Sequence, residues 1–276
     1  MYRVKFRYSL LGIFFVLAAK PASLEASTAK STTSLLLQKK ERVMQLYAQK
    51  RYEKANALLE TILPAIKDKI ERSDLHFCRA YCNFYEKNYL VASNQFELFV
   101  KQYPFDARTE EALFMKGYSL AQVRIDTFLD QTTTYDAMHC LERYLAKFPT
   151  GNYLHQATQA LQKLQHRLLK KEFEAARLYA QLGHYRAAVV ALVHFKEDHP
   201  ESLFHGQVLE LLVRCYTQLA KHASNEVDHK ERIDAVQQCS SQLRNYVQAR
   251  STTAPDLRRN KKDKKDVFTL PQPNID

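Results

Sequence analysis

The residues best suited to chemistry in this chain are a cysteine pair with a neighbouring histidine. Cys78 and Cys82 stand one helical turn apart and His76 lies beside them, a spacing that could contribute to a metal site. A structural zinc site uses four ligands, usually from two short Cys or His pairs, and the second pair is missing here. We therefore expect no metal site. The cysteines are predicted to be buried small hydrophobic residues without a disulfide framework: Cys78, Cys82, Cys140, Cys215 and Cys239.

The motifs of the common enzyme classes are missing from the sequence. It contains no glycine-rich phosphate loop, no His-Glu-x-x-His zinc motif and no Gly-x-Ser-x-Gly nucleophile elbow. Its ten histidines are scattered, which is typical of solvated or capping groups. We therefore expect no catalytic residue, no cofactor and no enzymatic activity.

A set of aromatic residues near one cation is the candidate for peptide recognition. Helical spacing directs these side chains towards one surface or its rim: Lys40, Met44, Tyr47, Phe77, Tyr81, Phe84 and Tyr85. An aromatic groove beside a cation suits an extended peptide that ends in an aromatic residue and a carboxylate. The alternative is that the aromatic residues pack between helices, because a stripe at helical spacing more often belongs to a core.

The elements that must position these residues are helices, and one helix pattern occurs three times. An alanine is followed twelve residues later by a proline, with a bulky apolar residue four positions after the alanine and an aromatic residue seven after it. The pairs are Ala92 and Pro104, Ala137 and Pro149, and Ala188 and Pro200. The alanine allows two antiparallel helices to approach closely, and the proline ends the second helix.

This repetition predicts an all-α solenoid of about five helix-turn-helix units, because ~34-residue helical pairs are typical of tetratricopeptide repeats. The expected packing alanines are Ala55, Ala92, Ala137 and Ala188. In the first unit the proline, Pro64, follows its alanine by only nine residues. The third unit carries a threonine-containing insertion at residues 125–134, a candidate functional loop, and an extra helix is expected at residues 153–168.

The chain is predicted to contain five successive segments. They are an export signal at residues 1–26, a tether at 27–34, repeats 1 and 2 at 35–104, repeats 3–5 at 105–250, and a basic disordered tail at 251–276. The signal follows from three cations, an uncharged apolar run at residues 10–19 and small residues after it. The run is too short to span a bilayer, which requires ~20 apolar residues. The alternative is a short amphipathic or buried helix.

The charge of the chain is concentrated at its two ends. The net charge is +11, and residues 1–26 and 256–266 each carry a surplus of three positive charges. The remainder is mildly basic, which permits acidic partners or membrane headgroups. The run from Arg258 to Lys265 could also contact nucleic acid or anionic lipid, but export excludes nucleic acid as a partner.

Four segments resemble the BamD family of outer-membrane assembly lipoproteins. They are residues 102–105, 110–118, 130–132 and 175–188, and the resemblance extends over about residues 35–250. It implies a five-repeat scaffold at the periplasmic face of the bacterial outer membrane. In that family the carboxy-terminal repeats dock on the barrel-forming subunit BamA, and the amino-terminal repeats receive unfolded barrel precursors. The alternative function is a periplasmic repeat adaptor for division or cell-wall enzymes.

The chain departs from the family pattern at the residue that should carry the lipid. Leu17, Ala18 and Ala19 resemble the start of a lipoprotein signal, but Lys20 stands where the lipidated cysteine would be expected. The sequence therefore predicts no lipid attachment at this position.

Overall fold

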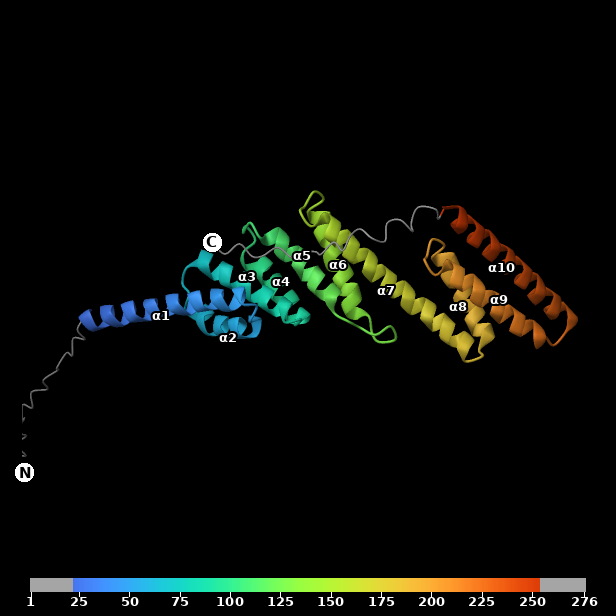
Figure 1. Ribbon diagram of the computed structural model, residues 1–276, viewed down its shortest axis with the longest axis horizontal. Coiled ribbons are helices and arrows are strands. Elements are labelled where there is room, and N and C mark those ends of the chain that lie inside the picture. Colours follow the sequence, from blue (N-terminus) through green and yellow to red (C-terminus); the bar gives the residue numbers. More distant parts are fainter. Residues whose placement is uncertain (1–21, 254–276) are drawn as a thin grey trace, which may run out of the picture. The chain divides into compact units, whose positions relative to one another are not determined.

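The computed structural model describes residues 22–253 of the chain, and the side chains of residues 34–250. The predicted export signal up to residue 21, and the predicted tail from residue 254, lie outside the described residues. All regular structure within the described part is helical, which confirms the all-α class (Figure 1). The helices are α1 (Ala22–Ala48), α2 (Tyr52–Ile62), the 3-10 helix η1 (Leu63–Ala65), α3 (Lys69–Tyr85), α4 (Tyr89–Gln102), α5 (Thr109–Gln122), α6 (Thr132–Lys147), α7 (Leu154–Gln181), α8 (Tyr185–Asp198), α9 (His205–Lys221) and α10 (Glu226–Thr253).

The described part of the chain divides into two compact units, residues 22–65 and residues 66–253. In the described part of unit 1, α1 packs against α2 and η1 follows directly. Residues 27–34, the predicted tether, lie inside α1. The boundary expected between residues 104 and 105 falls inside unit 2, where α4 and α5 pack on each other.

Unit 2 is a stack of antiparallel helix pairs from α3 to α10. Each helix contacts the next one along the chain, and α7 also contacts α5 and α9 (Figure 1). Contacts confined to near neighbours are the mark of a solenoid, in which each pair buries its apolar face on the adjacent pair. One such face is formed by α7 to α10 around Phe173, Leu192, Phe195, Leu212 and Cys215.

The prolines mark three equivalent joints between the pairs of unit 2. Helices α4, α6 and α8 end at Gln102, Lys147 and Asp198, each two residues before a proline. The next helix begins five residues after that proline in all three cases, at Thr109, Leu154 and His205. Proline lacks an N–H donor and disfavours a helical conformation in the residue before it, so the helix stops there.

Small residues lie where the helices approach most closely. All four packing alanines are fully buried, in α2, α4, α6 and α8: Ala55, Ala92, Ala137 and Ala188. Gly117 serves the same purpose on α5, because a Cβ atom there would stand 3.0 Å from Leu141 Cγ and 3.1 Å from Cys140 Cβ of α6. A larger side chain at these positions would separate the helices of a pair.

Helix α7 differs from the expectation of a separate extra helix at residues 153–168. It runs without a break from Leu154 to Gln181 and therefore also forms the first helix of the fourth pair. No glycine or proline occurs within it, and straight-chain residues with high helix propensity fill its middle. The single helix replaces the two that we expected.

Two intra-pair turns of unit 2 use the left-handed backbone region. Lys87 has φ 65° between α3 and α4, and Gly183 has φ 80° between α7 and α8. In both, the next amide N–H donates to a carbonyl five residues earlier, from Asn88 to Asn83 and from His184 to Tyr179. This is the Schellman arrangement, in which glycine is the usual left-handed residue. Lysine adopts the conformation at the first of these turns, and Lys50 in unit 1 does the same with φ 58°.

Candidate peptide-binding site

Three predicted groove residues lie on α1 in unit 1. Lys40 and Met44 are half-buried, whereas Tyr47 is buried and meets Tyr52 edge-on with ring centroids 5.4 Å apart. Lys40 and Met44 therefore keep surface that a ligand could reach. Tyr47 does not, and we no longer assign it to a groove.

The four predicted groove residues on α3 belong mostly to the interior of unit 2. Phe77 and Tyr81 expose no surface and Phe84 exposes 7%. The centroid of the Phe77 ring lies 5.2 Å from that of Tyr81 and 5.0 Å from that of Phe99 on α4. The groove assignment of these three residues is corrected, because they pack between helices. Tyr85 is half-buried, so a groove role for Tyr85, Lys40 and Met44 stays a prediction.

A buried carboxylate joins α3 to α5. Tyr81 Oη donates a hydrogen bond to Glu111 Oε1, and Tyr153 bonds to the same carboxyl group. Burial raises the pKa of Glu111 above its usual 4.5 despite these bonds, because a charge is poorly solvated there. Burial, with the nearby Glu111 charge, also raises the pKa of Tyr81. The protonated, neutral forms of Glu111 and Tyr81 are thus favoured. The hydrogen bond between them serves to hold α3 and α5 together.

The Glu111→Gln variant is expected to gain stability relative to the wild type as the pH rises. The folded chain holds the Glu111 proton more tightly than the unfolded chain, so wild-type folding is coupled to proton uptake above pH 4.5. Glutamine cannot ionise and still accepts from tyrosine. Urea denaturation between about pH 4 and about pH 7 measures the trend. Glu142→Gln on the surface of α6 is the control, and a difference that does not change with pH would contradict the account.

Arg108 ties the joint between α4 and α5 to α3. Its Nη2 lies 2.8 Å from Asp106 Oδ2 and 2.8 Å from Asp74 Oδ1, and it donates to Ser73 Oγ at 2.9 Å. The guanidinium also lies over the Phe77 ring, 5.0 Å from its centroid. These Arg108 bonds hold the pKa of Asp106 below its usual 3.8. The arrangement is a structural clamp.

The insertion expected at residues 125–134 is a loop only up to residue 131, because α6 begins at Thr132, and side chains of α7 hold this loop and the residues just before it. Lys171 Nζ donates to the Leu129 carbonyl at 2.9 Å, and Arg167 Nη1 donates to the Val123 carbonyl at 3.2 Å. Within the loop, Gln131 Nε2 donates a hydrogen bond to the Asp126 carbonyl at 3.0 Å. Phe128 is left 64% exposed at its tip. The loop therefore presents an apolar side chain on a fixed backbone.

The five cysteines are free and buried, as the sequence analysis expected. Burial raises the pKa of the Cys140, Cys215 and Cys239 thiols. A hydrogen bond with Cys78, followed by burial, raises the pKa of Cys82. Within residues 34–250, no three His, Cys, Asp or Glu side chains are placed to hold a metal ion.

Alkylation is expected to leave all five thiols of the folded protein largely unmodified. Burial blocks access of the reagent to all five, and the raised pKa of Cys82, Cys140, Cys215 and Cys239 also disfavours the thiolate, which is the reactive form. Iodoacetamide at about pH 8 should label them at least tenfold more slowly in the native protein than in urea, where thiols approach their ordinary pKa of about 8.5. Mass spectrometry counts the labels. Rapid native labelling of any one cysteine would show that its part of the stack opens.

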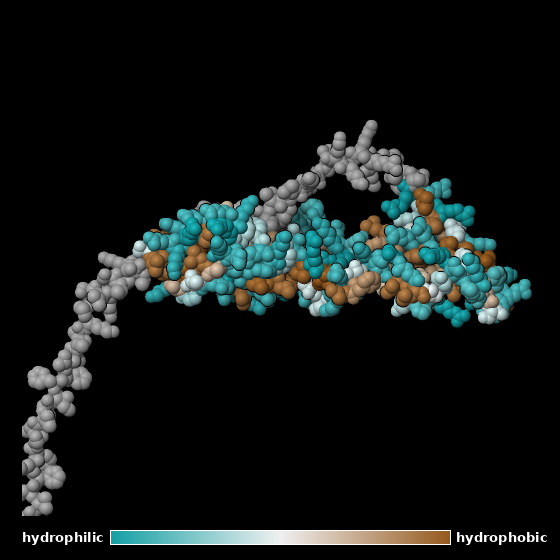
Figure 2. Space-filling model, turned by 60° about the horizontal axis from the view of Figure 1, so that its bottom comes forward, coloured by the Kyte–Doolittle hydropathy of each residue, from teal (hydrophilic) through white to brown (hydrophobic). Residues whose placement is uncertain are grey.

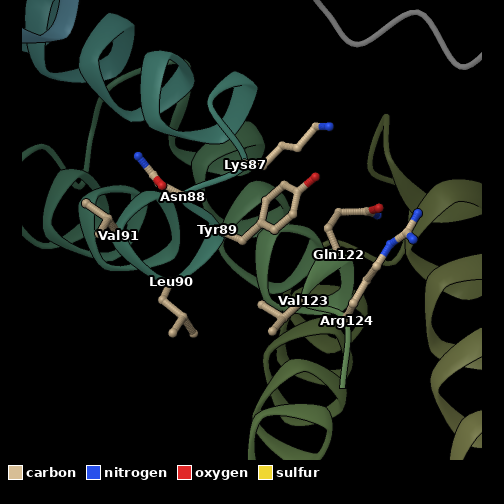
Figure 3. A pocket seen from close by; sticks show the side chains of 8 residues that line it. All are labelled: Lys87, Asn88, Tyr89, Leu90, Val91, Gln122, Val123 and Arg124. Atoms are coloured by element: carbon tan, nitrogen blue, oxygen red, sulfur yellow. The ribbon is translucent and has the colours of Figure 1, made fainter. Parts of the chain in front are cut away.

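An open pocket lies where the turn between α3 and α4 meets the carboxy-terminal end of α5. Its volume is about 740 Å³, within the usual size of ligand sites. We call it the turn pocket, and Figure 3 shows the residues that line it: Lys87, Asn88, Tyr89, Leu90, Val91, Gln122, Val123 and Arg124. Leu90 and Val91 remain 54% and 48% exposed.

The turn pocket combines positive charge with apolar and amide groups. Lys87 and Arg124 are its charged lining residues, and no acidic residue lines it. Among the described residues, neither cation forms an ion pair. The Tyr89 ring stands between the Lys87 and Gln122 side chains (Figure 3). The Tyr89 ring also packs on the Phe84 ring, with their centroids 5.5 Å apart, so the pocket borders the aromatic core.

Sequence analysis missed the turn pocket because its walls come from two different repeats. The visible signal was local: Leu90 and Val91 form an apolar pair in the first turn of α4 and lie on its exposed side.

On the face shown in Figure 2, apolar residues form separate patches among hydrophilic ones. None of the helices in the described part of the chain has the length and apolar composition needed to cross a membrane.

Comparison with known proteins places this helical stack in a family. A family model described as YfiO, outer membrane lipoprotein, matches residues 38–232, from α1 into α10. The outer membrane protein assembly factor BamD of Caulobacter vibrioides is 23% identical over 136 residues. That match covers 49% of this chain and 45% of the length of the relative. The resemblance to the BamD family is thus confirmed, and the chain belongs to the YfiO family of outer membrane lipoproteins.

Proposed function

We propose that the chain is a non-enzymatic scaffold of the complex that assembles β-barrel proteins in the outer membrane. The family match over residues 38–232 carries this proposal, and a relative named as an outer membrane protein assembly factor supports it. A stack of helix pairs suits the role because it offers extended surfaces to several partners at once. The expected location is the periplasmic face of the outer membrane.

The proposed partners bind different repeats. Residues 105–250 dock on a BamA-like barrel subunit, and residues 35–104 help to receive unfolded barrel precursors. Apolar surface at the turn between α7 and α8 suits a protein contact, since Tyr179, Leu182 and Val190 are 45%, 61% and 56% exposed. For the precursors, the remaining candidates are the half-buried Lys40 and Met44 within unit 1 and, separately, the half-buried Tyr85 within unit 2.

Depletion of the protein in cells is expected to lower the amount of folded outer-membrane barrel proteins. Crosslinking through a photoreactive residue at Leu182, followed by mass spectrometry, should identify the BamA-like subunit. A photoreactive residue at Leu98, which is 51% exposed on α4 and lies outside residues 105–250, serves as the comparison. Unchanged barrel levels would contradict the proposal. Defects in division or wall shape, with division or wall proteins crosslinked instead, would favour an envelope adaptor.

A further inference from the structure

We propose that the turn pocket binds an acidic, extended peptide segment of a partner protein. Lys87 and Arg124 would hold the carboxylates of the segment, and aliphatic side chains flanking those carboxylates would cover Leu90 and Val91. This site differs from the predicted groove, since it lies at the turn edge of unit 2 and shares no residue with that groove. It does not depend on which complex the chain joins.

The charge of the turn pocket carries the first step of the argument. Two cations and no acid line it, and neither cation is engaged in an ion pair within the described residues. The nearby carboxylate of Glu86 already accepts a hydrogen bond from Asn88 Nδ2 at 3.1 Å. An arginine fork and a lysine ammonium group are both suited to carboxylate binding. The complementary ligand is therefore an anion.

The apolar and amide groups of the turn pocket favour a peptide as the source of that anion. Leu90 and Val91 also line the turn pocket and are about half exposed, so they offer apolar surface to aliphatic side chains. Asn88 and Gln122 supply amide groups that can donate to and accept from a peptide backbone. Recognition of anionic lipid surfaces typically uses clusters of roughly four to eight Lys or Arg residues, whereas two line this pocket.

The conformation of Lys87 makes one substitution informative. It has φ 65° at a position where the equivalent turn of unit 2 has Gly183 at φ 80°. A side chain with this backbone conformation costs conformational energy that glycine avoids. Replacement by glycine should remove the ammonium group without disturbing the turn.

A random heptapeptide phage library selected on the purified full chain tests the proposal. Enriched peptides are expected to contain Asp or Glu beside Leu, Ile or Val. A synthetic peptide of the most enriched sequence should then bind in calorimetry, and its Kd should rise about tenfold in Arg124→Gln, as expected for loss of one charge-assisted hydrogen bond. Lys87→Gly should raise the Kd similarly while stability is kept or increased, so unfolding cannot explain that loss.

Lys50→Gly is the matched control because Lys50 has nearly the same φ, 58°, in unit 1 and lies outside the turn pocket. The Kd of this variant should equal that of the wild type. Selected peptides without an excess of acidic residues would overturn the proposal, as would a Kd unchanged by Arg124→Gln and Lys87→Gly. Sedimentation with phosphatidylethanolamine–phosphatidylglycerol vesicles is the second arm. Binding that needs both cations there, with no peptide enriched, would also overturn it.

Discussion

Replacing Phe77 by alanine is expected to lower the free energy of unfolding by about 3–5 kcal/mol. The side chain has no exposed surface, and its ring lies 6.0 Å from Phe96 and 5.0 Å from Phe99. Truncation would leave a cavity between α3 and α4 and would remove the ring that the Arg108 guanidinium covers. Urea denaturation followed by circular dichroism measures the loss.

Phe105→Ala is the matched control for this substitution. Phe105 is 100% exposed, so its removal should change the unfolding free energy by no more than about 0.5 kcal/mol. The comparison separates packing from recognition. If Phe77→Ala kept wild-type stability but weakened the binding of barrel precursors, Phe77 would return to the groove that the sequence suggested.

The second large effect is expected from Arg108→Ala, which should cost about 2–4 kcal/mol of unfolding free energy. The substitution leaves Asp106 without its hydrogen bonds from Arg108, and the Asp106 side chain is only 16% exposed. It also removes the bond between Arg108 Nη2 and Ser73 Oγ that fixes the joint to α3. The unfolding free energy of Arg108→Lys should lie between those of the wild type and Arg108→Ala, since a lysine keeps the charge but not the planar fork.

The pH dependence of the Arg108 clamp provides an independent check. The folded-state pKa of Asp106 lies below its usual 3.8, so the unfolded chain binds its proton first as the solution is acidified. The clamp therefore stabilises the fold fully above pH 3.8 and loses this contribution as the pH falls through the folded-state pKa. Arg108→Ala should lose less stability than the wild type over that acid range.

Arg177→Ala is the matched control for the clamp variant. Its side chain is 43% exposed, and its Nη1 lies 3.2 Å from Glu174 Oε1 on the same helix. Exposed pairs of this kind contribute at most about 1 kcal/mol. An equal loss of unfolding free energy in both arginine variants would mean that burial of the Arg108 clamp adds nothing to stability.

The fold was largely predictable because its repeated signals are local. Each joint depends on one proline and the residue before it, and each close helix contact depends on one small residue such as Ala92 or Ala137. The continuity of α7 was not predictable in this way. The extra helix expected at residues 153–168 places a boundary near Leu168, whereas residues 154–181 contain no glycine or proline that would end a helix.

The candidate sites were less predictable because they depend on which helix faces are covered. Helical spacing correctly put Phe77, Tyr81 and Tyr85 together, with Tyr81 and Tyr85 stacked at 5.9 Å. The same spacing fits a core and a groove equally well, and only packing against α4 decides between them. Prediction of the turn pocket would also have required the packing of successive repeats, since Lys87 and Arg124 lie at the ends of helices from two of them.

The unbroken course of α7 also has a mechanical consequence. A helix of 28 residues is about 42 Å long at 1.5 Å per residue. It contacts α5 and α6 as well as α8 and α9. Without an internal glycine or proline hinge, such a rod resists bending and turns as one lever. A tilt imposed by a ligand on the repeats before it would thus be transmitted as torque to those that follow.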